Sequence, residues 1–227
     1  VFVQVGAMNL RDTLELAAHA RSVGADGIAV VTPSYFKLSD DELFLYYKAV
    51  AESMPADYPI YLYGIPQCAV NDISPALAAR VAEACPNVIG LKYSFNDMIR
   101  LQKFMEIRGG TFSVFSGCDV MFAMTALAGA DGIVSGNAQA IPEHYVAVWE
   151  AVKAGDAKKA MQIQHRTNML NQIMCHDHDK ARFKAVLQHR GVLEYDCMRA
   201  PLQPVSAEEA KAMNALLDEK EFTRVVV

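Results

Sequence analysis

The sequence predicts an α/β protein in which a parallel, barrel-like sheet is followed by a helical tail. Apolar runs alternate with helix-like segments over residues 1–141, and such repeated strand–helix units indicate a parallel sheet covered by helices. After residue 141 only helix-like patterns remain. An open doubly wound sheet usually carries a glycine-rich phosphate loop, and neither GxGxxG nor GxxxxGKS/T occurs in the sequence, so a barrel is favoured.

Six apolar runs are the predicted strands. In order, they are VFVQVGA (1–7), GIAVVTP (27–33), PIYLYG (59–64), NVIGLKY (87–93), TFSVFSG (111–117) and GIVSG (132–136). Polar residues lie toward the C-terminal ends of the later runs: Thr32, Tyr63, Lys92, Ser116, and Ser135 with Asn137. In a parallel barrel these ends meet on one face, which is where such a fold places its functional groups.

Helical patterns fill the segments between and after these runs. The segment 10–24 has apolar residues at helical spacing, Asn9 as its N-cap and Gly24 as its stop. Asp72 or Ser74 is the predicted cap of the segment 74–85. The tail contains four more predicted helices, at 142–154, 156–175, 179–190 and 206–220. No linker of biased composition interrupts the chain, so we expect one domain.

Composition excludes two classes of partner. The 227 residues are 52% hydrophobic and carry a net charge of −5 with no basic run, which argues against nucleic acid. No apolar stretch approaches the roughly 20 residues needed to span a bilayer, so we expect no membrane. The five cysteines are scattered, odd in number and without CxxC, a pattern typical of reduced thiols in a cytoplasmic protein.

Lys92 near the end of an apolar run is the residue that most needs an explanation. A lysine at a strand end commonly extends to solvent. Strand alternation, however, puts Val88, Gly90 and Lys92 on one face and the intervening apolar residues on the other. In a barrel the bulky apolar face packs on the helices, so Lys92 is predicted to point inward, with Gly90 leaving space beneath it.

An inward lysine at the C-terminal end of a strand suggests covalent catalysis. An amine becomes nucleophilic when desolvation lowers its pKa, and it then condenses with a ketone to form a Schiff base. Such chemistry also needs a proton shuttle, which a tyrosine hydroxyl can provide. Tyr63 lies on the neighbouring predicted strand at a similar depth.

At these residues the chain resembles a known family. YLYGIP (61–66), GLKYS (90–94), FSGCD (115–119) and GADGIVSG (129–136) are similar to segments of the dihydrodipicolinate synthase and N-acetylneuraminate lyase family. The opening residues 5–36 resemble that family's third and fourth strand–helix units. The tail segments RFKAVLQHRG (182–191) and RAPLQPVS (199–206) extend the resemblance.

The resemblance implies a (β/α)8 TIM barrel with a C-terminal helical extension. Residues 1–141 would hold barrel strands three to eight, and residues 142–227 the last barrel helix and the extension. The first two strand–helix units would be absent, which at roughly 30 to 40 residues each amounts to about 70 residues. The chain would then be a fragment of a longer protein.

The resemblance also implies an activity and its residues. Family members form a Schiff base with pyruvate or another 2-oxo acid, and cleave or condense it with an aldehyde, without a cofactor or metal. Lys92 matches the Schiff-base lysine, Tyr63 the tyrosine of a Y-N-x-P motif, and Tyr35 a tyrosine that reaches an adjacent subunit, so we expect a homotetramer. The predicted substrate-binding residues are Thr32, Cys68, Gly117, Val134 and Ser135.

Three positions depart from the family pattern. Gly64 replaces the asparagine of Y-N-x-P. Cys68 stands where the synthase has an arginine for its second substrate, and Val120 where the sialic acid lyase has an acidic residue. We therefore expect aldol cleavage or condensation with a smaller or less charged aldehyde. The synthase reaction, sialic acid cleavage and dehydration of a 2-oxo-3-deoxy sugar acid remain alternatives.

Other interpretations receive less support. A catalytically inactive family member would not need to retain both Lys92 and Tyr63. A sugar-phosphate barrel enzyme without covalent catalysis would need a stronger phosphate loop than GNAQAIP (136–142). CHDHD (175–179) invites a metal site, but consecutive residues point in different directions, so we expect a loop between two tail helices there.

Overall fold

The computed structural model describes residues 1–175 and 179–225, which divide into two compact units. The first unit contains residues 1–118 and 128–133, and the second contains residues 119–127 and 134–225. The predicted division after residue 141 differs from this boundary, because residues 119–127 and 134–141 pack with the helices of the second unit. That the two units form one domain stays a prediction.

The first unit is built on a six-stranded sheet whose strands follow the order of the sequence. The strands are β1 (Phe2–Gln4), β2 (Gly27–Val31), β3 (Ile60–Gly64), β4 (Val88–Tyr93), β5 (Ser113–Ser116) and β6 (Gly132–Ile133). Each neighbouring pair is parallel. The predicted parallel α/β architecture is thus confirmed as a half-barrel sheet, and closure into a barrel stays a prediction.

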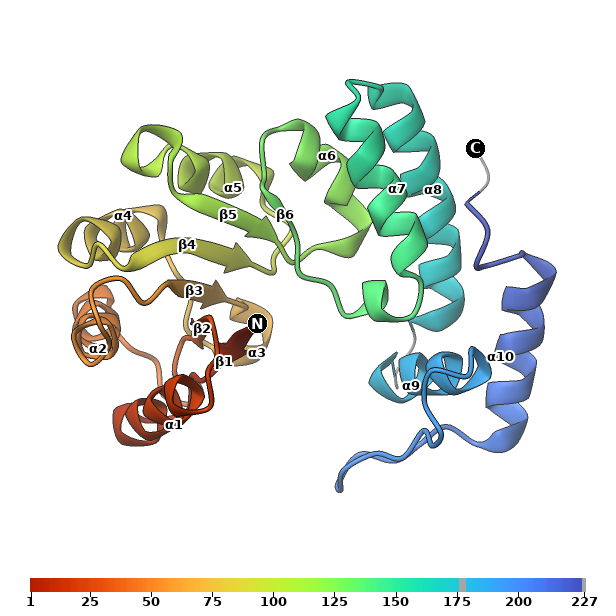
Figure 1. The fold of residues 1–227 in the computed structure, drawn as a ribbon, viewed down its shortest axis with the longest axis horizontal. Coiled ribbons are helices and arrows are strands. Elements are labelled where there is room, and N and C mark those ends of the chain that lie inside the picture. Colours follow the sequence, from red (N-terminus) through yellow and green to blue (C-terminus); the bar gives the residue numbers. More distant parts are fainter. Residues whose placement is uncertain (176–178, 226–227) are drawn as a thin grey trace. The chain divides into compact units, whose positions relative to one another are not determined.

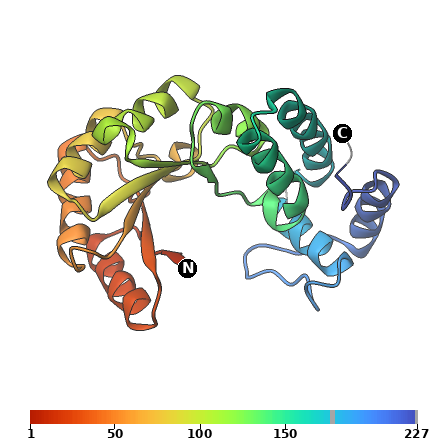
Figure 2. The same cartoon turned by 45° about the horizontal axis from the view of Figure 1, so that its top comes forward.

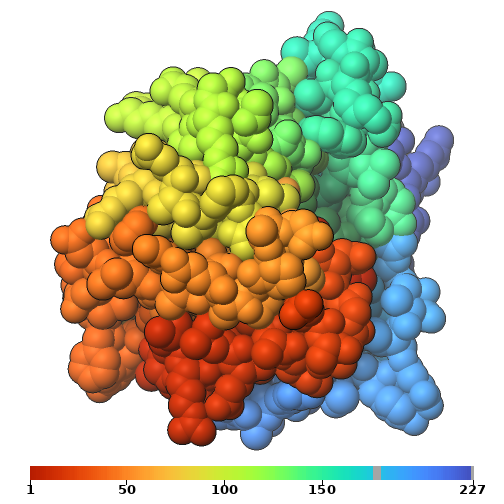
Figure 3. All heavy atoms as spheres, turned by 60° about the vertical axis from the view of Figure 1, so that its left-hand side comes forward, coloured from red at the N-terminus to blue at the C-terminus, as the bar shows by residue number. Residues whose placement is uncertain are grey.

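Helices cover one face of this sheet. They are α1 (Leu10–Ser22), α2 (Asp40–Glu52), α4 (Pro75–Ala84) and α5 (Met98–Met105), with the short α3 (Pro66–Ala69) and the 3-10 turn η1 (Ile107–Gly110) in the connections. Figures 1 and 2 show these helices along the outside of the strands. In the space-filling view of Figure 3 the consecutive strand–helix units form adjacent bands of colour.

Two helix starts follow the predicted capping residues. The Asn9 side chain accepts the Asp12 amide, and Ser74 Oγ accepts the Leu77 amide, so each satisfies a backbone donor in the first turn of its helix. Ser74, rather than Asp72, is therefore the cap of α4. Gly24 follows α1 with φ 82°, a left-handed conformation that suits glycine and ends the helix.

The two faces of the sheet differ in character. The residues that face the helices form the hydrophobic core and are buried, among them Ile28, Val30, Ile60, Leu62, Leu91 and Tyr93. On the other face the side chains of Tyr61, Tyr63, Lys92 and Phe115 are only partly buried. Alternation along each strand thus turns Lys92 away from the helix layer, as predicted.

A β-bulge at the start of β4 overturns one part of the predicted alternation. Ile60 pairs with Val88, but the next residue, Tyr61, pairs with Gly90, so Ile89 is the extra residue. Val88 consequently belongs to the buried core. The prediction that Val88 shares the face of Lys92 was wrong, because a bulge shifts the alternation by one residue.

The space beneath Lys92 is also different from the prediction. A Cβ atom at Gly90 would clash with the ring of Tyr61 and the carbonyl of Ser113. The Tyr61 hydroxyl donates to Ser113 Oγ at 3.0 Å, which fixes the ring over Gly90. Gly90 therefore admits an aromatic side chain of the neighbouring strand, and the space is filled.

The second unit is helical. It contains η2 (Asp119–Met121), α6 (Phe122–Leu127), η3 (Asn137–Gln139), α7 (Pro142–Lys153), α8 (Ala157–Met174), α9 (Asp179–His189) and α10 (Ala207–Glu219). All four predicted tail helices are confirmed, and α7 and α8 lie side by side (Figure 1). The predicted strand 132–136 ends early, at Ile133, because the chain turns into η3, where Ser135 Oγ accepts the Ala138 amide at 2.9 Å.

A buried histidine of α7 forms a hydrogen bond with the segment that follows α10. His144 is fully buried, and its Nε2 lies 2.7 Å from the carbonyl oxygen of Phe222. Its Nδ1 is buried without a hydrogen-bond partner.

Within the described residues, no helix is long and apolar enough to cross a membrane.

Candidate active site

Lys92 lies beside Tyr63 at the C-terminal end of the sheet. The two residues are paired in register on β4 and β3, and Phe115 is paired with Lys92 on β5. The Nζ of Lys92 lies 4.0 Å from the centroid of the Tyr63 ring. Because the negative face of an aromatic ring attracts an ammonium group, this contact holds the amine over the ring. The structure thus brings together the two residues predicted to carry the chemistry.

Aromatic side chains form the floor below this pair. The rings of Phe2 and Tyr61 meet edge to face at 5.3 Å, and those of Tyr61 and Phe115 at 5.5 Å between centroids. Such offset contacts between rings are the favourable ones. Lys92 therefore adjoins an aromatic layer on this face of the sheet, and its amine lies over the ring of Tyr63.

Gly117 makes close contact with Lys92 possible. A Cβ atom at this position would lie 2.9 Å from Lys92 Cε and would clash with the side chain of Ser94. The Gly117 amide donates to the carbonyl of Tyr93 at 2.8 Å, which fixes the end of β5 against the end of β4. Only a residue without a side chain fits between Lys92 and Ser94 here.

Ser94 is a polar residue that the sequence analysis missed. It is 6% exposed, and its Oγ is buried without a hydrogen-bond partner. An unpartnered buried hydroxyl is uncommon, because it forfeits hydrogen bonds to water. The signal was available, since Ser94 follows Lys92 by two residues and alternation predicts that both share a face.

The connection after β3 contains Cys68 and lies next to the end of β4. The side-chain Nε2 of Gln67 donates to the carbonyl of Ser94 at 2.8 Å, which holds α3 next to the end of β4. Cys68 is exposed in this helix.

A Cβ atom at Gly64 would lie 2.7 Å from Cδ2 of Tyr93, so the large ring at position 93 leaves no room for an asparagine at position 64.

Tyr35 protrudes from the loop between β2 and α2. It is 73% exposed and has φ 82°, a left-handed conformation that is uncommon for a bulky residue. Its ring meets that of Phe36 edge to face at 4.9 Å. Thr32, at the start of the same loop, is buried, and its hydroxyl donates to the carbonyl of Asn71 at 3.2 Å.

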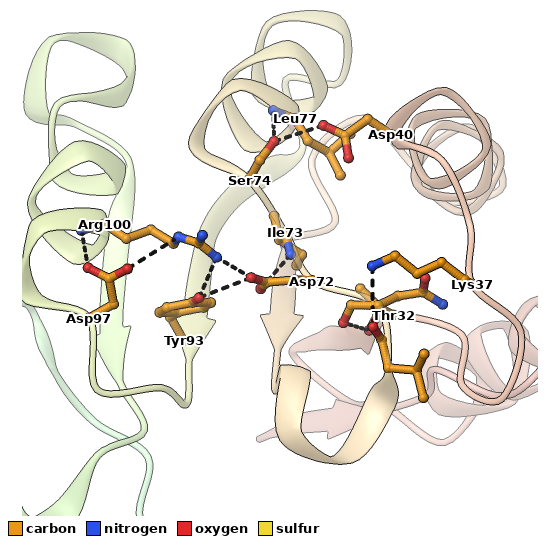
Figure 4. A network of polar contacts seen from close by, with 12 residues as sticks. Thr32, Lys37, Asp40, Asp72, Ile73, Ser74, Leu77, Tyr93, Asp97 and Arg100 are labelled. Atoms are coloured by element: carbon orange, nitrogen blue, oxygen red, sulfur yellow. Dashed lines mark hydrogen bonds and ion pairs between the residues drawn. The ribbon is translucent and has the colours of Figure 1, made fainter.

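A charged cluster surrounds the hydroxyl of Tyr93, which lies on the helix side of β4 (Figure 4). The Arg100 guanidinium donates to the Asp72 carboxylate and, at 2.8 Å, to the Tyr93 hydroxyl. Tyr93 in turn donates to Asp72 at 3.3 Å. Burial, followed by the nearby carboxylate of Asp72, raises the pKa of Tyr93 to about 12, so this phenol stays protonated and acts as a donor.

Val134 and Ser135 belong to the second unit. Val134 is 49% exposed, and Ser135 Oγ accepts the Ala138 amide in η3. Val120, at another predicted specificity position, is also exposed in this unit. The neighbouring Tyr145 is buried on α7 and its hydroxyl accepts from Asn171 Nδ2 at 2.9 Å. Burial raises the pKa of Tyr145.

No metal cluster is present in the part of the chain that the structure describes: no three histidine, cysteine, aspartate or glutamate side chains there could hold an ion. The CHDHD segment was predicted to form a loop. Its residues 176–178 lie outside the described residues, so the prediction for them is not tested.

A model of the dihydrodipicolinate synthetase family matches residues 1–220. The chain belongs to this family. It is 30% identical over 213 residues to the 4-hydroxy-tetrahydrodipicolinate synthase of Thermus thermophilus, covering 94% of this chain and 71% of the synthase. It is 32% identical over 211 residues to the N-acetylneuraminate lyase of Mediterraneibacter gnavus, covering 92% of this chain and 66% of the lyase.

Solved structures of the dihydrodipicolinate synthetase family share the fold. The crystal structure of YagE from Escherichia coli K12, a prophage protein of this family in complex with pyruvate, superposes with a TM-score of 0.88 at 28% identity. It covers 98% of this chain, which spans 75% of the YagE chain. Across curated relatives the chain spans as little as 53% of their length. The resemblance seen in the sequence is thus confirmed.

Proposed function

We propose that this protein is a class I lyase of the dihydrodipicolinate synthetase family, which forms a Schiff base between Lys92 and pyruvate or another 2-oxo acid. The observation that carries the proposal is the Lys92 amine 4.0 Å above the ring of Tyr63, at the C-terminal end of paired strands.

The reaction begins when the Lys92 amine attacks the keto carbon of the 2-oxo acid. A carbon–nitrogen bond forms, the carbonyl oxygen leaves as water, and an iminium results. In cleavage, a base removes the proton of the substrate hydroxyl, and the adjacent carbon–carbon bond breaks to release an aldehyde. The electron pair of the broken carbon–carbon bond moves toward the iminium nitrogen and gives an enamine. Protonation and hydrolysis then release the 2-oxo acid and the free amine.

Tyr63 and Tyr35 are the proposed proton carriers of this sequence. Each has a hydroxyl that can exchange a proton with the substrate in the course of the reaction. Ser94 adds a polar group next to Lys92, and its unpartnered Oγ is available to hydrogen bond a substrate oxygen. Thr32, Gly117, Val134 and Ser135 are the other proposed substrate-binding positions.

The second substrate is proposed to be a small or weakly charged aldehyde. Cys68 lacks the guanidinium that forms paired hydrogen bonds with a carboxylate, and Val120 offers nothing to a chain of hydroxyl groups. Dehydration of a 2-oxo-3-deoxy sugar acid is the nearest variant, since it passes through the same Lys92 imine. A panel that couples pyruvate release to lactate dehydrogenase, and follows dehydration separately, distinguishes these reactions.

Borohydride reduction in the presence of pyruvate tests the proposed chemistry. The intact mass of the full-length protein should rise by one reduced pyruvyl group, and peptide mapping should locate it on Lys92. Lys92→Arg should abolish the adduct. Lys103→Ala, a change to an exposed lysine of α5, should leave it intact. Unmodified protein after reduction would refute the proposal and leave an inactive family member as the better explanation.

We also propose that β1–β6 are six of the eight strands of a closed barrel, and that the protein assembles as a homotetramer. The single layer of helices and the aromatic inner face support the barrel. The exposed rings of Tyr35 and Phe36 support the assembly. If the barrel needs further strands, the 227-residue chain alone should aggregate through its strand edges. Light scattering that gives a monomer for the full-length protein would contradict the tetramer.

A further inference from the structure

Tyr35 has a backbone conformation that needs support from its surroundings. Its φ of 82° lies in the left-handed region, which a bulky side chain rarely adopts. Such a conformation persists only where neighbouring contacts hold it, and it often marks a functional site. Because Tyr35 itself is 73% exposed, its own side chain contributes little to that support.

Asn71 provides contacts on both sides of Tyr35. Its Nδ2 donates to the carbonyl of Pro33 at 2.8 Å and to that of Phe36 at 2.8 Å. Its Oδ1 accepts the amide of Leu38 at 2.8 Å. One side chain thus binds three backbone groups of the Tyr35 loop, and it is fully buried. These bonds fix the loop before and after its unusual residue.

The backbone around Asn71 is itself fixed. Its carbonyl accepts the Thr32 hydroxyl at 3.2 Å, which closes the contact with the start of the Tyr35 loop. The preceding residue, Val70, also has a left-handed φ of 65°, and its carbonyl accepts from Lys37 Nζ at 3.4 Å. The two segments that these contacts join therefore each contain a residue with a left-handed φ, Tyr35 in one and Val70 in the other.

The next residue links this arrangement to the strand of Lys92. Asp72 accepts hydrogen bonds from Arg100 and Tyr93, and Tyr93 directly follows Lys92 on β4 (Figure 4). Asn71 and Asp72 therefore reach in two directions, one to the Tyr35 loop and the other to the end of β4. The Tyr35 loop is thus linked to the end of β4 through two adjacent residues.

We propose that Asn71 is a positioning residue that fixes the Tyr35 loop, and with it the position of the hydroxyl that serves as a proton carrier in the proposed reaction. This inference rests on the proposed function, in which Tyr35 carries a proton. A loop clamp with only a structural task would stabilise the protein without acting through Tyr35. The two roles differ in what happens when Tyr35 has already lost its hydroxyl.

A double-mutant cycle with Tyr35→Phe tests the proposal on the full-length protein. Asn71→Ser should lower kcat for the preferred substrate by about tenfold to a hundredfold, since small misplacements of a reacting group have effects of this size. In the Tyr35→Phe background the same change should alter kcat by less than about twofold, because coupled residues are not additive. Equal losses in both backgrounds would overturn the proposal.

Asn87 supplies the matched control. It too is a buried asparagine, and its Nδ2 donates to the carbonyls of Ala51 at 3.0 Å and Pro55 at 3.3 Å, before the start of β4. Asn87→Ser should lower the unfolding midpoint without a change in kcat. A loss of kcat in Asn87→Ser equal to that in Asn71→Ser would assign both effects to stability and overturn the proposal.

Hydrogen exchange gives a readout that does not depend on catalysis. The Leu38 amide, which donates to Asn71, should exchange faster in Asn71→Ser and at the parent rate in Asn87→Ser. Asn71→Asp keeps that acceptor but loses both Nδ2 donors, so it should protect Leu38 while still lowering kcat. If Asn71→Ser does not fold, Asn71→Asp takes its place in the kcat measurements of the cycle. An unchanged Leu38 exchange rate in Asn71→Ser would refute the clamp.

The proposed function is checked first and separately. Pyruvate and borohydride must yield the Lys92 adduct on the unaltered protein. Absence of that adduct would refute the reaction, and this inference with it. Formation of the adduct together with additive losses in the cycle would leave the reaction intact and refute only the role of Asn71.

Discussion

The amine of Lys92 lies 4.0 Å from the centre of the Tyr63 ring, and the two residues are paired across adjacent parallel strands. The amine thus contacts the face of the ring. In the proposed reaction the ring and the hydroxyl of Tyr63 therefore have separable tasks, the first to hold the amine and the second to move a proton.

Tyr63→Phe separates these tasks. The phenylalanine ring keeps the contact with Lys92, so pyruvate and borohydride should still give one adduct at the end point. Turnover should fall by about 10²- to 10⁴-fold, the usual contribution of an acid–base group. Tyr58→Phe, which removes a hydroxyl two residues before β3, should leave turnover unchanged. An unimpaired Tyr63→Phe enzyme would refute the assigned role.

Ser94→Ala should lower activity without lowering stability. Removing a buried hydroxyl that has no partner relieves a desolvation penalty, so the unfolding midpoint should stay the same or rise. If the hydroxyl binds substrate, kcat/KM should fall about tenfold. Ser113→Ala is the contrast, because Ser113 Oγ accepts from Tyr61 and its loss should destabilise the protein. Full activity in Ser94→Ala would show that the hydroxyl does not meet substrate.

Cys68→Arg should shift the preference toward an acidic aldehyde. A guanidinium in this exposed helix can form two parallel hydrogen bonds with a carboxylate, worth about 1.5 to 3 kcal/mol when charged groups pair. Dihydrodipicolinate formation from pyruvate and aspartate semialdehyde should then increase tenfold or more. Cys197→Arg, at an exposed cysteine of the second unit, should have no such effect. Efficient synthesis by the unaltered protein would contradict the reading of Cys68.

His144 should make the second unit less stable in mild acid. Burial lowers the pKa of His144 from its ordinary 6.5, because an added proton would sit on Nδ1, which has no partner. The unfolded chain then binds more protons than the folded one, so stability is present above about pH 6.5 and is lost as the pH falls below it. Urea unfolding followed by Trp149, the single tryptophan and a residue of α7, measures this.

His144→Gln should flatten that pH dependence. The glutamine amide can still donate to the carbonyl of Phe222, but it does not titrate. His19→Gln, at an exposed residue of α1, should leave the slope unchanged. If His144→Gln and the parent protein lose stability in parallel between pH 7 and pH 5, another group is responsible.

The sequence was sufficient for features that depend on local pattern. Six strands, the tail helices, the Asn9 cap and the direction of Lys92 all follow from alternation, helical spacing and capping. Ser94 belongs to the same group, because alternation places it on the same face as Lys92. These features could be predicted since each depends on neighbours that are close in sequence.

Other features could not be predicted because they depend on distant residues. The bulge at Ile89 arises from the register between β3 and β4, and no composition cue marks it. The three bonds of Asn71 join groups 33 to 38 positions apart, so its role was invisible before the loops were in place. The boundary of the two units likewise depends on which helices pack together.

The ring of Tyr93 and the missing side chain of Gly64 also constrain how this protein can evolve or be recombined. A larger residue at position 64 would meet the ring at 2.7 Å, so it becomes acceptable only after position 93 has become smaller. The order of substitution therefore matters, and one of the two routes passes through a damaged intermediate. A chimera with a relative that has asparagine at position 64 should keep β3 and β4 from the same parent. A crossover between these strands would combine an asparagine at position 64 with the tyrosine at position 93, and the two side chains would compete for the same space.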